Sequence, residues 1–180
     1  MLNEGKGVPI NKKESARYFK LAADQGHIES IFKYANMLYE GDGITKNKEM
    51  AAWYFDKAGD KGHIESIYKY AKMLQEGDGI SKNPQRASEY FKQAGDQGHD
   101  ESIFKYAYML YRGEGMAKNK EKAAQYFKLA ADHGHLESMY KYARMLQEGD
   151  GIEYNTKNAA AYFKQAADQG HTASINKYGL

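Results

Sequence analysis

The chain has 180 residues, with 26 Lys and Arg against 24 Asp and Glu and no Cys. A net charge of +2 argues against a dedicated nucleic-acid-binding protein, which would carry a strong basic excess. The absence of Cys excludes a disulfide framework, a thiolate metal site and a Cys nucleophile. Because the sequence has neither a membrane-length apolar run nor a signal-peptide pattern at its start, we expect a cytoplasmic protein without a membrane partner.

An internal repeat of 36 residues dominates the sequence, and Met-Leu, Gly-x-Gly and Gly-His all recur at this spacing without insertion or deletion. A fixed period of about 20–50 residues is typical of solenoids and propellers. The repeat predicts one domain over residues 1–180. Its units are 1–27 (partial), 28–63, 64–99, 100–135, 136–171 and 172–180 (partial).

Each full unit predicts two amphipathic helices, as the unit 28–63 illustrates. The segment 29–39 places these residues on one arc: Ser30, Ile31, Tyr34, Ala35, Met37 and Leu38. The segment 48–61 does the same with Ala51, Ala52, Phe55, Ala58 and Gly59, and with Tyr54 at the edge of the arc. No window alternates with the period of two that a strand requires, so the expected fold class is all-α.

Turn and cap residues separate the predicted helices. Gly41 and Gly43 can supply the positive φ that a tight turn needs. Asn47 stands where an N-cap would satisfy a free N–H of the second helix, and Gly62 ends that helix. Because a single helix pair cannot bury its apolar arc, we expect a right-handed α-solenoid of five 36-residue helix-turn-helix repeats.

The motif residues resemble those of the Sel1-like repeat, a family related to tetratricopeptide repeats. The residues that carry the resemblance in one unit are Ser30, Tyr34, Ala35, Leu38, Gly41, Gly43, Ile44, Asn47, Ala51, Tyr54, Ala58 and Gly62. Tetratricopeptide repeats themselves run 34 residues and lack the Gly-x-Gly turn. The resemblance implies an adaptor scaffold for protein complexes, not an enzyme, with the first helix of each repeat lining the concave face.

The repeats differ most on the arc of the first helix opposite the predicted core. We predict that this arc forms a partner-binding groove for a protein or peptide with acidic and apolar residues. The predicted groove residues are Phe32, Asn36, Tyr39, Tyr68, Lys72, Gln75, Phe104, Tyr108, Tyr111, Tyr140, Arg144 and Gln147. The alternative, at Phe32 and its equivalents, is that these rings only cover the next repeat.

Three other repeated patterns have structural explanations. The lysines at Lys33 and its equivalents follow a glutamate by four residues, which predicts exposed ion pairs. The Gly-His pairs predict a helix C-cap with hydrogen bonding between repeats. The single acid of each Gly-x-Gly loop is too few for a calcium site. The sequence therefore predicts no catalytic residue, no metal site and no cofactor.

The repeats also alternate in pairs, since position 39 and its equivalents read Tyr39, Gln75, Tyr111 and Gln147. Duplication of a 72-residue pair explains this pattern, and it would give a groove whose chemistry repeats every two units.

The ends of the sequence are partial helices. Three explanations are open: an excerpt of a longer array, two frayed half-helices, or docking of one molecule's end beside the next. The last of these is the alternative function, a structural module that joins head to tail as a weak homo-oligomer.

Overall fold

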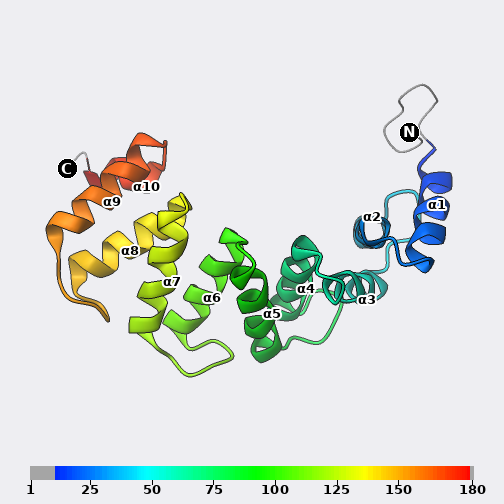
Figure 1. Cartoon of the computed structure of the whole chain (residues 1–180), viewed down its shortest axis with the longest axis horizontal. Helices are drawn as coiled ribbons and strands as arrows, with labels where there is room; N and C mark the ends of the chain where they lie inside the picture. The colour runs from blue at the N-terminus through cyan, green and yellow to red at the C-terminus, as the bar shows by residue number, and fades with distance from the viewer. Residues whose placement is uncertain (1–10, 179–180) are drawn as a thin grey trace. The chain divides into compact units, whose positions relative to one another are not determined.

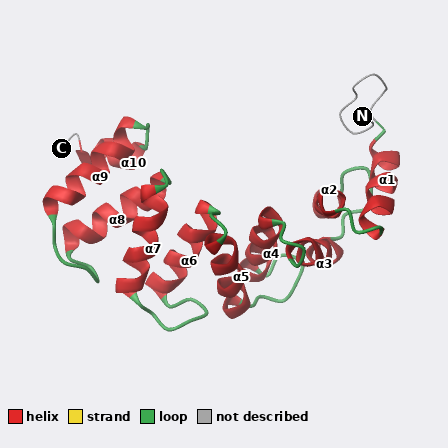
Figure 2. Cartoon of the chain, in the orientation of Figure 1, coloured by secondary structure: helices red, strands yellow, loops and turns green. Residues whose placement is uncertain are grey.

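The computed structural model describes residues 11–178 and is all-helical over that range, without a strand (Figures 1 and 2). The all-α prediction is therefore confirmed. The helices are α1 (Lys12–Asp24), α2 (Ile28–Glu40), α3 (Lys48–Gly59), α4 (Ile64–Glu76), α5 (Pro84–Asp96), α6 (Asp100–Arg112), α7 (Lys120–Asp132), α8 (Leu136–Glu148), α9 (Thr156–Asp168) and α10 (Thr172–Tyr178). The partial helix expected at the start of the sequence falls within residues 1–10, which lie outside the described residues.

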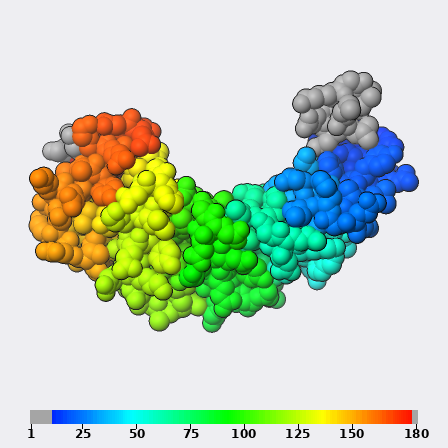
Figure 3. All heavy atoms as spheres, viewed as in Figure 1, coloured from blue at the N-terminus to red at the C-terminus, as the bar shows by residue number. Residues whose placement is uncertain are grey.

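The chain divides into two compact units, Met1–Tyr90 and Phe91–Leu180. In the first unit α1 packs on α2, α2 on α3 and α3 on α4. In the second unit α6 packs on α7, and the sequence of neighbouring contacts continues through α8 and α9 to α10. Figure 3 shows that the side chains of successive helices within each unit lie in contact.

Helix caps fix the boundaries of each repeat. The Asn47 side chain accepts a hydrogen bond from the backbone N–H of Met50 at 2.9 Å, as an N-cap should. The histidine of each Gly-His pair is also an N-cap: His27 Nδ1 accepts the N–H of Ser30 at 3.3 Å. The C-cap predicted at the Gly-His pair is present as well, because Gly26 takes a φ of +87° and the backbone N–H of His27 bonds to the Ala22 carbonyl at 3.0 Å.

The predicted apolar arcs form the core. Ile31, Ala35, Ala51 and Ala58 have no exposed surface, and the other predicted arc residues of this repeat are also buried. Tyr54, expected at the edge, is 5% exposed, since its ring packs edge-on against Tyr34 with centroids 4.9 Å apart. The same tyrosine pair joins the two helices of each following repeat: Tyr70 with Tyr90, Tyr106 with Tyr126, and Tyr142 with Tyr162.

Small residues let neighbouring repeats approach closely. A Cβ added at Gly59 in α3 would lie 3.0 Å from Cγ1 of Ile67 in α4. In the second unit, Ala131, Met139 and Ala166 form one buried cluster although they come from three successive helices. Within each unit, successive repeats therefore close their apolar surfaces against one another.

The second glycine of the Gly-x-Gly loop is a contact point between repeats. Gly79 has φ +79°, and a Cβ there would lie 2.2 Å from Cβ of Lys48, the first residue of α3 in the preceding repeat. Gly62 has a similar φ of +86°, but an added Cβ would meet no atom within 4 Å. A substitution at Gly62 therefore introduces backbone strain alone, whereas the same substitution at Gly79 adds a clash with the preceding repeat.

We predict that Gly79→Ala destabilises the chain more than Gly62→Ala does. Gly62→Ala should cost about 1–2 kcal/mol through its left-handed backbone alone. Gly79→Ala should cost roughly 1–3 kcal/mol more, because Lys48 must move. Urea denaturation of both variants measures the difference, and equal losses would show that the close approach of Lys48 contributes nothing.

Candidate interaction surface

The predicted groove residues lie on the first helices α2, α4, α6 and α8, and none of them is fully buried. Arg144 is exposed and the other eleven are half-buried. The face is therefore accessible in each unit.

The aromatic side chain at position 32 packs against the next repeat on one side and is partly exposed on the other. The Phe32 ring lies 6.0 Å from that of Phe55 and 4.4 Å from that of His63, the N-cap of α4. Phe104 and Tyr140 make the equivalent pair of contacts in the second unit. These rings brace the junction to the next repeat and keep one side accessible.

Position 39 joins consecutive repeats through a hydrogen bond that the sequence did not reveal. The Tyr39 hydroxyl donates to Asp78 Oδ2 at 2.6 Å, and Lys48 forms an ion pair with the same carboxylate. Asp78 belongs to the Gly-x-Gly loop of the next repeat. The second unit repeats this triad with Tyr111, Asp150 and Lys120. The only sequence signal was that Tyr39 and Tyr111 recur together 72 residues apart.

The contacts within the triad shift the pKa values of Tyr39 and Asp78. The hydrogen bond to Asp78, together with partial burial, raises the pKa of Tyr39 from 10.0 to about 12. Hydrogen bonds from Lys48 and Tyr39 hold the pKa of Asp78 below its ordinary value. The folded state therefore favours a protonated Tyr39 beside a charged Asp78.

Lys33 and its equivalents do not form the row of Glu–Lys ion pairs that the sequence predicted. Lys105 does pair with Glu101 at 3.6 Å, but Lys33 lies over the ring of Phe19 and Lys141 over that of Tyr108. The glutamates of this pattern reach the histidine cap of the next repeat. The Glu–His separations are 3.4 Å for Glu29–His63, 3.1 Å for Glu101–His135 and 3.0 Å for Glu137–His171. The ammonium groups of Lys33 and Lys141 therefore lie over aromatic rings, whereas the glutamate carboxylates connect repeats.

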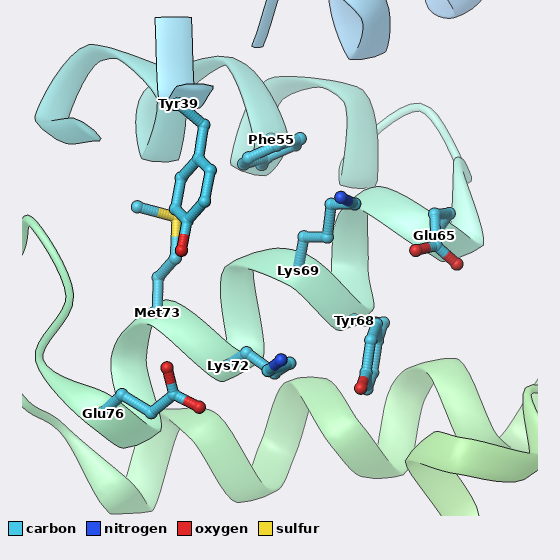
Figure 4. A pocket seen from close by; sticks show the side chains of 8 residues that line it. All are labelled: Tyr39, Phe55, Glu65, Tyr68, Lys69, Lys72, Met73 and Glu76. Carbon is cyan, nitrogen blue, oxygen red and sulfur yellow. The ribbon is translucent and has the colours of Figure 1, made fainter. Parts of the chain in front are cut away.

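A pocket of about 140 Å³, here called pocket A, opens between α2, α3 and α4 in the first unit (Figure 4). It is lined by Tyr39, Phe55, Glu65, Tyr68, Lys69, Lys72, Met73 and Glu76. In Figure 4 Lys69 extends from α4 towards Phe55, and its Nζ lies 5.8 Å from that ring centroid. Three predicted groove residues, Tyr39, Tyr68 and Lys72, thus line one cavity.

A second pocket, pocket B, has a volume of about 180 Å³ and lies between α6, α7 and α8 in the second unit. It is lined by Tyr108, Tyr111, Arg112, Phe127, Lys141, Arg144, Met145 and Glu148. Six of these residues are the 72-residue equivalents of pocket A residues. Six lining positions therefore recur every two repeats, in line with the alternation of the sequence, whereas the other two differ between the pockets.

Within residues 11–178 no group of three or more His, Cys, Asp or Glu side chains is arranged to hold a metal ion. No helix in the same range combines the length and apolar character needed to span a bilayer.

The arrangement of paired helices with a constant period places the chain among tandem helical-repeat proteins. A family model for the Sel1 repeat matches residues 1–27, 28–63, 64–99, 100–135 and 136–171, so the chain belongs to the Sel1 repeat family. Members of this family are generally protein–protein interaction scaffolds.

Solved structures agree with this assignment. The c5321 protective antigen of uropathogenic Escherichia coli is 25% identical, with a TM-score of 0.95 over 99% of this chain. This chain spans 38% of the length of that protein. A Sel1 repeat protein from Oxalobacter formigenes, 24% identical, has a TM-score of 0.85 and covers 98% of this chain and 72% of its own. No curated protein matches the sequence.

We predict that Tyr39→Phe lowers the free energy of unfolding by about 1.5–3 kcal/mol near neutral pH, because it removes a hydrogen bond to a charged group. A raised pKa contributes stability that is complete below the unfolded value of 10.0 and is lost as pH rises towards about 12. The difference between the parent chain and the variant should therefore shrink above pH 10.0.

Urea denaturation at about pH 8 and about pH 11 tests this expectation. Tyr18→Phe is the control, because Tyr18 is 54% exposed on α1. A Tyr39→Phe deficit that stays constant between the two pH values would contradict the role assigned to the Tyr39 hydroxyl.

Proposed function

We propose that the chain is a non-enzymatic scaffold that binds a segment of a partner polypeptide on the exposed face of its first helices. The observation that carries this proposal is the recurrence of one pocket in both units. Pockets A and B share six equivalent lining positions, and both include predicted groove positions. The general role of Sel1 repeat proteins as interaction scaffolds supports the same conclusion.

The size and lining of the pockets favour side chains of a polypeptide over a cofactor. Volumes of about 140 and 180 Å³ lie below the roughly 300–1,000 Å³ typical of small-molecule sites. Tyrosine and arginine are the residues that most often anchor protein interfaces, because they combine apolar area with hydrogen bonding. Tyr108 and Arg144 supply both at pocket B.

The test is selection of a displayed peptide library on the immobilised chain. Tyr108→Ala combined with Arg144→Ala should abolish recovery of the peptides that the parent chain selects at pocket B. Both side chains are incompletely buried, so the helical circular dichroism and the melting curve should change little. Folding loss equal to the binding loss would place these residues in the core and refute the proposal.

Tyr154→Ala combined with Lys157→Ala is the matched control. Both residues are exposed and lie away from pocket B in the same unit, and the pair removes one tyrosine and one cation. Peptide recovery should remain at the parent level. An equal loss in both double variants would mean that binding does not depend on the first-helix face.

A further inference from the structure

The repeat that supplies α6 to pocket B differs from the other repeats at two positions of this helix. Position 40 carries glutamate as Glu40, Glu76 and Glu148, but it carries Arg112 in this repeat. Position 36 is aromatic only at Tyr108, since its equivalents are Asn, Lys and Arg. Residues 108 and 112 are four apart, so they share one face of the helix. The fold tolerates glutamate at position 40, and therefore the repeat itself does not require arginine there.

Both changes concentrate positive charge around one ring. The Arg112 guanidinium carbon lies 5.6 Å from the Tyr108 ring centroid, and Arg112 Nη1 donates to the Tyr108 hydroxyl at 3.2 Å. Lys141 Nζ, from α8, lies 5.5 Å from the same centroid. Tyr108 thus holds two cations from two repeats at the rim of one pocket.

These two cations have no ion-pair partner among the carboxylates of residues 11–178. Glu148 is the one carboxylate in the pocket lining, and it accepts hydrogen bonds from Arg144 at 2.7 and 3.1 Å. Pocket B is consequently lined by three cations and one carboxylate. Pocket A, by contrast, is lined by two lysines and two glutamates. The charge balance of the lining therefore distinguishes the two pockets, and pocket B has an excess of positive charge.

We propose that pocket B binds the carboxylate of an aspartate or glutamate side chain in the partner polypeptide, which deepens and rests on the proposed function. Arg112 offers a planar donor pair that matches a carboxylate, and Lys141 adds a second charge. Phe127 and Met145 provide apolar lining for the residue beside the acid. The three cations of the lining would also attract the dianion of a phosphorylated side chain, so the experiment below includes a phosphoserine pool to distinguish the two anions.

The experiment uses three pools of a degenerate hexapeptide library on the full chain. One central residue is fixed as Glu, Gln or phosphoserine, and bound peptide is quantified for each pool. The parent chain should retain the Glu pool at least about tenfold better than the Gln pool, because charge-assisted hydrogen bonds are lost with glutamine.

Arg112→Glu should reduce this preference to about one, because it places glutamate where three other repeats already have it and reverses the charge of the site. Arg17→Glu is the matched control: Arg17 is exposed on α1, and the substitution changes the net charge equally. It should leave the preference within about twofold of the parent value. Arg112→Gln removes the charge without reversing it and should give an intermediate loss.

The outcomes separate this inference from the proposed function. Equal retention of the Glu and Gln pools would overturn the carboxylate site and leave the polypeptide scaffold intact. A phosphoserine pool retained more strongly than the Glu pool would overturn the choice of carboxylate. Equal loss in Arg17→Glu and Arg112→Glu would show a response to net charge instead of a site. Background retention of every pool would refute the scaffold proposal itself.

Discussion

The structure depends on one constraint, which is that the apolar stripe of each helix pair is covered by the next pair. The buried cluster of Ala131, Met139 and Ala166 shows how this works, because it takes one residue from each of three successive helices. Helices of 12 or 13 residues are marginal in water by themselves. Packing between repeats therefore supplies the stability that helix propensity cannot. The small residues at the seams, Gly59 among them, are the geometric condition for that packing.

The same constraint explains how the proposed binding surface can be recognised. Positions that face a neighbouring repeat keep the same small or apolar residues, whereas the exposed arc of the first helix is free to vary. The residues at equivalent positions of the other repeats consequently show which residue types the fold accepts at a given position. Arg112 is informative because Glu40, Glu76 and Glu148 show what the fold accepts at that position. Tyr39 and Tyr111 are informative for the opposite reason, since their hydroxyls bind loop aspartates and connect repeats.

Sequence reasoning predicted the fold well because periodicity and capping are local signals. The helix arcs, the Asn47 cap and the turn glycines follow from spacing and residue type alone, and all are confirmed. Contacts between repeats could not be derived in this way. The Tyr39–Asp78 hydrogen bond joins residues 39 positions apart, and the position of Lys141 over Tyr108 depends on how α8 packs near α6. The row of accessible positions on the first helices was therefore predictable, whereas the charge balance of each pocket required coordinates.

The most direct test of the account compares the isolated segment 27–63 with the full chain by far-ultraviolet circular dichroism and thermal unfolding. That segment contains one complete helix pair with all its caps but without a neighbouring repeat. We predict low helicity and no cooperative transition for the segment, against high helicity and a cooperative transition for the full chain. A segment that folds cooperatively on its own with native helicity would contradict the claim that each repeat needs the next.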